Sequence, residues 1–95
     1  MTAPANTAYP ISEDLPSELA ALVEPLACVV NGTNRAALRP GEAVVVFGAG
    51  AIGCLFIAVF RASGAGRIIA VEPSVARARV ARAVGANAVL TPDQW

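Results

Sequence analysis

AVVVFGAGAIG, residues 43–53, is the stretch that decides how this chain folds. Its first five residues are apolar and rich in valine, which is typical of a parallel strand covered on both faces. The six residues that follow, 48–53, form a GxGxxG turn, and an apolar helix is expected from Ala51 to Ala62. A strand that enters a glycine-rich turn and leaves it as a helix predicts the start of a βαβ unit.

The residues after this helix repeat the same order of elements. A second buried strand is expected over 67–71, a helix capped by Ser74 and ended by Gly85, and a third strand over 87–91. The spacing of four apolar residues predicts the buried face of that helix: Ala76, Val80, Ala83 and Val84. The fold class is therefore α/β, a partial Rossmann fold of three parallel strands (βαβαβ) preceded by a helical segment.

Three segments are expected along the chain. Residues 1–14 form an irregular lead-in, residues 15–42 a helical segment, and residues 43–95 the βαβαβ unit. Proline breaks a helix interior but is tolerated at the first helical position. We therefore expect one helix over 17–23 and a second one that begins with Pro25.

Composition excludes several classes of protein. Apolar residues make up 56% of the chain, and its seven arginines balance seven acidic residues, with no lysine. A nucleic-acid-binding protein would carry a basic surplus, so none is expected as a partner. Acidic residues dominate the first part of the chain and arginines the second, which suits either an anionic ligand or a solvated helix surface. With no secretory signal and two isolated cysteines, we expect a cytoplasmic protein.

A membrane span is the alternative interpretation of residues 43–60. This run has eighteen residues without a charge, the lower limit for a spanning helix. Three glycines interrupt it, valines cluster before them, and no aromatic belt flanks it. A strand followed by a buried helix explains the run better, so no membrane is expected as a partner.

The GxGxxG turn is the predicted binding site. Gly48 permits the tight turn, Gly50 has no Cβ to block a pyrophosphate, and Gly53 allows close packing of helix and strand. The helix N-terminus then presents backbone N–H groups and a favourable dipole to the phosphates. The predicted cofactor-binding residues of the turn are Gly48, Ala49, Gly50, Ala51, Ile52 and Gly53.

Glu72 and Arg77 complete the predicted dinucleotide site. Glu72 follows Gly53 by nineteen residues, close to the spacing of the acid that accepts hydrogen bonds from the ribose hydroxyls. Its charge would repel a 2′-phosphate, so NAD is expected and NADP is disfavoured. Arg77 could offset that repulsion or lie beside the adenine, or it could be part of a solvated helix surface.

Glu24 lies in an apolar segment next to the helix break. A carboxylate there must be paired, hydrogen-bonded, metal-bound or exposed, and exposure or helix capping is the default expectation. Histidine is absent, and Cys28 and Cys54 lack the spacing of metal ligands.

Taken together, these motifs resemble those of the medium-chain, zinc-type alcohol and polyol dehydrogenases, closest to the sorbitol, threonine and inositol branch. The likeness runs from about Tyr9 to Pro92. Its carriers are Glu24–Ala27, Arg39–Gly41, Val44–Gly53, Ala65–Glu72 and Val84–Asn87.

The resemblance implies an oxidoreductase that reversibly transfers a hydride from a secondary alcohol or polyol to NAD, with zinc as a Lewis acid. It implies that Glu24 lies beside the catalytic zinc and that Glu72 and Arg77 hold the adenosine ribose. Residues 15–42 would then connect from the catalytic-domain side, and residues 43–95 would be the first half of the NAD-binding Rossmann domain. Complete members are often homo-oligomers.

The main zinc ligands of such enzymes, a cysteine and a His-Glu pair, precede this segment, and this chain has no histidine. We therefore expect a fragment that binds the adenosine and pyrophosphate but is inactive alone. The alternative is a non-catalytic dinucleotide-binding or interaction module.

Overall fold

The computed structural model describes residues 2–95 and confirms an α/β fold with three parallel strands. Two short 3-10 helices lie near the ends of the chain. In order, the elements are η1 (Ala5–Thr7), α1 (Ser17–Ala20), α2 (Val23–Ala36), β1 (Ala43–Phe47), α3 (Ala51–Ala62), β2 (Arg67–Val71), α4 (Val75–Ala83), β3 (Ala88–Leu90) and η2 (Pro92–Gln94). The predicted bounds of β1, α3 and β2 are confirmed.

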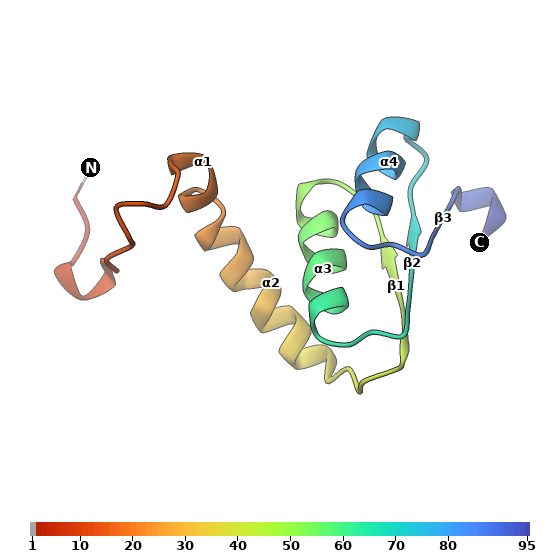
Figure 1. Ribbon diagram of the computed structural model, residues 1–95, viewed down its shortest axis with the longest axis horizontal. Coiled ribbons are helices and arrows are strands. Elements are labelled where there is room, and N and C mark those ends of the chain that lie inside the picture. Colours follow the sequence, from red (N-terminus) through yellow and green to blue (C-terminus); the bar gives the residue numbers. More distant parts are fainter. Residues whose placement is uncertain (1) are drawn as a thin grey trace.

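The sheet has the strand order β1-β2-β3, as expected for two right-handed βαβ crossovers. Phe47 pairs with Val71, and Val71 pairs with Leu90, so all three strands end together at one carboxyl edge. Figure 1 shows α3 and α4 side by side against the sheet, while the lead-in extends away from this body. The loops at the carboxyl edge are therefore brought close together.

The hydrophobic core lies between the sheet and these two helices. Alternate strand residues Val46, Ile68 and Ala70 pack there with Ile57 and Phe60 of α3. The other face of β1 is open, since Phe47 is 65% exposed. Trp95 covers part of it, with its ring edge-on to Phe47 at a centroid distance of 5.3 Å.

Helix α2 packs against α3 and contributes the buried residues Val29 and Thr33. A Cβ on Gly32 would meet the ring of Phe56, which shows how closely the two helices approach. The prediction that α2 begins at Pro25 is wrong, because the helix starts at Val23 and Pro25 is its third residue. The first-turn amides of a helix have no intrahelical acceptor, so proline is tolerated there too.

The predicted helix over 17–23 is also shorter, and α1 ends at Ala20. Residues 88–90, rather than 87–91, form β3. The backbone N–H of Asn87, just before the strand, donates a hydrogen bond to the carbonyl of Ile68 at 2.8 Å.

The predicted buried face of α4 is wrong. Ala78 and Ala81 are the buried residues of this helix, whereas Val80 is 51% exposed. Of the predicted face, only Val84 is half-buried, and it packs against the core. The two alanines allow α4 to approach the sheet closely, and the many apolar residues of this helix fit more than one face.

The uncharged run over residues 43–60 is divided between β1 and α3. Across residues 2–95, no helix is long and apolar enough to cross a membrane. The strand-and-helix interpretation of this run is confirmed.

Asn87, directly before β3, is hydrogen-bonded to β2 and to the end of α3. Its Oδ1 accepts hydrogen bonds from the backbone N–H of Ile68 at 2.7 Å and from Arg61 Nη2 at 2.8 Å. The same Arg61 Nη2 donates to the carbonyl of Gly85 at 2.6 Å. One side chain thus satisfies a strand amide and a guanidinium at once.

We predict that Asn87→Ala lowers the free energy of unfolding by about 1–3 kcal/mol, because it removes the acceptor of a part-buried amide. Urea unfolding followed by circular dichroism measures the change. Asn31→Ala, on the exposed side of α2, is the control and should leave stability nearly unchanged. Equal stability of the two variants would contradict the role assigned to Asn87.

Candidate functional site

The glycine turn lies at the carboxyl end of β1, where the chain enters α3. Gly48 has a φ of +87°, a conformation that other residues rarely adopt. Its N–H donates to the carbonyl of Val71 at 2.9 Å, which continues the parallel ladder past the end of β1. The turn is thereby attached to the neighbouring strand from its first residue.

The other two glycines of the turn differ in what surrounds them. A Cβ on Gly53 would collide with the carbonyl oxygen of Gly48, so that position requires glycine for packing. A Cβ on Gly50 would have no atom within 4 Å, and its φ of −70° suits any residue. Gly50 therefore leaves space in front of the turn that the fold itself does not need.

Helix α3 presents its N-terminus to that space. Gly50 is the N-cap and supplies no side-chain hydrogen bond, and no acidic residue occupies the first turn. The first amides of an α-helix, here those of Ala51, Ile52 and Gly53, have no intrahelical acceptor and lie at the positive end of the helix dipole. This arrangement suits an anion such as a phosphate.

Glu72, the first residue after β2, is buried beside the turn with 4% of its surface exposed. Its Oε2 accepts a hydrogen bond from the N–H of Ala49 at 2.9 Å, and its Oε1 accepts one from the N–H of Ser74 at 2.8 Å. The predicted ribose-binding acid and the predicted phosphate turn are thus in direct contact.

Hydrogen bonds keep this carboxylate ionised. The amide of Ser74, and then that of Ala49, lower the pKa of Glu72 below its ordinary value, and the charge of Arg77 adds to the effect. Burial opposes them and is the weaker influence. Each oxygen of an ionised carboxylate has a second lone pair, so Glu72 can still accept from a ligand hydroxyl.

Arg77 lies in the first turn of α4 with its side chain exposed. Its backbone N–H donates to the hydroxyl of Ser74 at 3.4 Å, which confirms Ser74 as the N-cap of this helix. Arg77 therefore lies on the same side of the molecule as Glu72.

A cavity of about 300 Å³ opens beside Glu72, between α4 and the segment after β3. Its polar lining residues are Glu72, Ser74, Arg82, Thr91 and Gln94. The last three were not predicted from the sequence. A signal for two of them exists, because Thr91 and Gln94 have the spacing of a capping box, and the N–H of Thr91 donates to Gln94 Oε1 at 2.9 Å.

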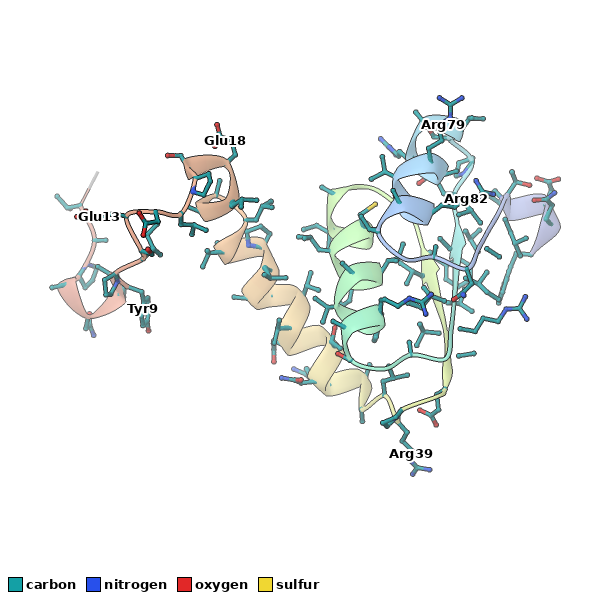
Figure 2. The ribbon with its side chains drawn as sticks, in the orientation of Figure 1. Tyr9, Glu13, Glu18, Arg39, Arg79 and Arg82 are labelled. Carbon is teal, nitrogen blue, oxygen red and sulfur yellow. The ribbon has the colours of Figure 1, made fainter. Side chains whose placement is uncertain are left out.

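The acidic residues of the first part of the chain and the arginines of the second part are also separated in space. Figure 2 shows Glu13 and Glu18 on the lead-in and α1, at the opposite end of the molecule from Arg79 and Arg82 on α4. Arg82 lines the cavity beside Glu72, and its charge favours a negatively charged ligand there.

Glu24 is exposed in the first turn of α2 and does not belong to this site. It lines a separate groove of about 610 Å³ together with Tyr9 and Ile11 of the lead-in. The thiol of Cys28 donates to Glu24 Oε1 at 3.6 Å, and the charge of Glu24 is the main cause of the raised pKa of Cys28.

Zinc requires more donors than this part of the molecule supplies. Glu24 and Cys28 offer two donors one helical turn apart, whereas catalytic zinc sites use three protein ligands. Within the described part of the chain, no three histidine, cysteine, aspartate or glutamate side chains are placed to hold a metal ion. The residues present do not form a zinc site by themselves.

Comparison with known proteins gives the following likenesses. No family model matches the chain. A protein of Aspergillus clavatus described as D-xylulose reductase A is 43% identical over 89 residues, which are 94% of this chain and 25% of that protein. L-threonine 3-dehydrogenase of Thermococcus kodakarensis is 44% identical, again over 94% of this chain and 25% of that protein. The chain therefore spans about a quarter of the length of these relatives.

Solved structures show the same likeness. A protein of Sinorhizobium meliloti 1021 described as a zinc-binding dehydrogenase, bound to NADP, superposes with a TM-score of 0.91 and 32% identity over 95% of this chain and 26% of that one. A protein of Escherichia coli described as a short chain alcohol dehydrogenase, complexed with NADH, has a TM-score of 0.89 and 26% identity over 97% of this chain and 28% of that one. Both of these structures hold a nicotinamide dinucleotide.

The lowered pKa of Glu72 predicts how stability depends on pH. The unfolded chain binds this proton more readily than the folded chain, so Glu72 stabilises the fold above its ordinary pKa. That contribution is lost as the pH falls through the lowered pKa. We predict that Glu72→Gln lowers the free energy of unfolding most at neutral pH, and that the difference from wild type shrinks as the pH falls below the ordinary glutamate pKa of 4.5 and through the lowered pKa of Glu72.

Urea unfolding at a series of pH values measures this difference. Glu13→Gln, on the exposed lead-in, is the matched control and should follow the wild type throughout. A difference for Glu72→Gln that is constant over the whole pH range would contradict the prediction.

Proposed function

The chain is homologous to a segment of the medium-chain, zinc-type alcohol and polyol dehydrogenases, and from that premise we propose that it binds the adenosine and pyrophosphate of NAD. The glycine turn is the observation that supports this most directly. Gly50 leaves open space in front of an uncapped helix N-terminus, where a pyrophosphate can approach the backbone. The residues proposed for the turn are Gly48, Ala49, Gly50, Ala51, Ile52 and Gly53.

We propose that the adenosine ribose lies beside Glu72. The carboxylate keeps free lone pairs for the two ribose hydroxyls, and the cavity of about 300 Å³ next to it offers room for an adjoining part of the nucleoside. Arg77, whose charge acts on Glu72, supplies positive charge at the start of α4. These assignments rest on the placement of the side chains around the turn.

In the complete enzyme, we propose, the reaction is the reversible oxidation of a secondary alcohol or polyol to a carbonyl compound. The C–H hydride goes to the nicotinamide of NAD, and the hydroxyl proton is released. Relatives of this chain are oxidoreductases that act on CH–OH groups. The part played by the present residues is to anchor the dinucleotide, so we expect the 95-residue chain to bind it without oxidising an alcohol.

The choice between NAD and NADP depends on Glu72. Solved relatives hold either NADP or NADH, so the likeness of fold favours neither cofactor. A buried and ionised Glu72 would repel a 2′-phosphate, whereas Arg77 would partly offset that repulsion. We therefore propose NAD as the cofactor.

We also propose a cytoplasmic location and a homo-oligomeric assembly for the complete enzyme. Cys28 and Cys54 are both free thiols, as expected in a reducing compartment such as the cytoplasm. Homo-oligomeric assembly of the complete enzyme is proposed from the family resemblance.

We predict that Gly50→Val weakens the binding of NADH by about tenfold or more, since a branched side chain occupies the space assigned to the pyrophosphate. The fold should persist, because nothing lies within 4 Å of the added Cβ. Calorimetric titration measures the affinity, and circular dichroism checks the fold. Ala76→Val, on the exposed side of α4, is the control. A folded Gly50→Val chain that binds NADH as the wild type does would refute the proposed site.

We further predict that NADH binds about tenfold more tightly than NADPH, because Glu72 repels the 2′-phosphate. Arg77→Ala should widen this preference by weakening NADPH more than NADH. Arg79→Ala, on the same helix and also exposed, serves as the control. Titrations at one fixed salt concentration make the comparison, and an equal or higher affinity for NADPH would show that the choice of NAD is wrong.

A further inference from the structure

The backbone of Ala49 is held on both sides of its Cα. Its N–H donates to Glu72 Oε2 at 2.9 Å, and its carbonyl oxygen accepts from the thiol of Cys54 at 3.4 Å. Ala49 itself is only 2% exposed. The second residue of the glycine turn is thus fixed by one side chain that follows β2 and another on α3.

The carboxylate of Glu72 also reaches a third element. Its other oxygen accepts from the N–H of Ser74, the N-cap of α4. A buried carboxylate with both oxygens bound to backbone amides costs a great deal to displace. Glu72 therefore connects the turn after β1, the end of β2 and the start of α4.

We propose that Glu72 and Cys54 are positioning residues of the pyrophosphate turn, which clamp the backbone N–H and C=O of Ala49 so that the amides after it are already in place for the phosphates. This inference rests on the proposed function and deepens it. A carboxylate that only contacted the ribose would have no effect on a ligand without ribose hydroxyls. A clamp affects every ligand that carries a pyrophosphate.

The thiol of Cys54 has the properties that the clamp requires. Only its protonated form donates a hydrogen bond, and burial together with the nearby charge of Glu72 raises the pKa of Cys54. The other cysteine, Cys28, is exposed on α2 and makes its hydrogen bond to Glu24. Cys28 therefore serves as the control position for substitutions of Cys54.

The test separates the ribose contact from the clamp by the choice of ligand. Adenosine, ADP and 2′,3′-dideoxy-ADP are titrated calorimetrically onto the wild type and onto four variants: Glu72→Gln, Cys54→Ala, Cys54→Ser and Cys28→Ala. We expect Glu72→Gln to weaken dideoxy-ADP by about tenfold although this ligand has no ribose hydroxyl to contact.

Cys54→Ala should weaken ADP about threefold to tenfold and leave adenosine unchanged, and Cys54→Ser should restore ADP binding because a hydroxyl is also a donor. Cys28→Ala should bind all three ligands as the wild type does. Unchanged binding of dideoxy-ADP by Glu72→Gln, or of ADP by Cys54→Ala, would overturn the clamp.

A second measurement needs no ligand. Amide hydrogen exchange at Ala49, followed by NMR, should be about tenfold faster in Glu72→Gln than in the wild type, while amides in the middle of β2 keep their protection. Equal exchange at Ala49 in the two chains would overturn the clamp on its own. A wild type that binds neither ADP nor NADH would instead refute the proposed function.

Discussion

The contact between the Glu72 carboxylate and the backbone around it organises the carboxyl edge of this protein. Parallel pairing ends β1, β2 and β3 together, but pairing alone does not fix the loops that follow. A buried negative charge requires hydrogen bonds, and here the amides of Ala49 and Ser74 supply them. The glycine turn and the start of α4 are held in one arrangement as a result.

Much of the fold could be predicted from local signals. The valine-rich run of β1, the glycines of the turn and the Ser74 cap act over a few residues, and each of these elements was placed correctly. The start of α2 and the buried face of α4 were not. Proline is tolerated throughout the first turn of a helix, so Pro25 does not mark the start of α2. The buried face of α4 depends on tertiary contacts, because the small side chains of Ala78 and Ala81 let this helix approach the sheet.

The candidate site could be predicted in outline for a related reason. The position of Glu72 in the sequence, at the end of the second strand, predicts that it lies near the turn, because parallel strands end at the same edge of the sheet. Spacing does not reveal that both carboxylate oxygens bind backbone amides, since Ala49 and Glu72 are 23 residues apart. The roles of Cys54 and of the cavity residues Thr91 and Gln94 likewise require coordinates.

The open edge of β1 has a consequence for the behaviour of the chain in solution. Its second side has no strand partner in the described sheet, and its sequence AVVVF carries neither charge nor proline. Such a strand is a template for intermolecular pairing and for cross-β association. Strand β1 therefore positions the glycine turn and, unless another strand pairs with its open edge, also makes this polypeptide prone to aggregate at high concentration.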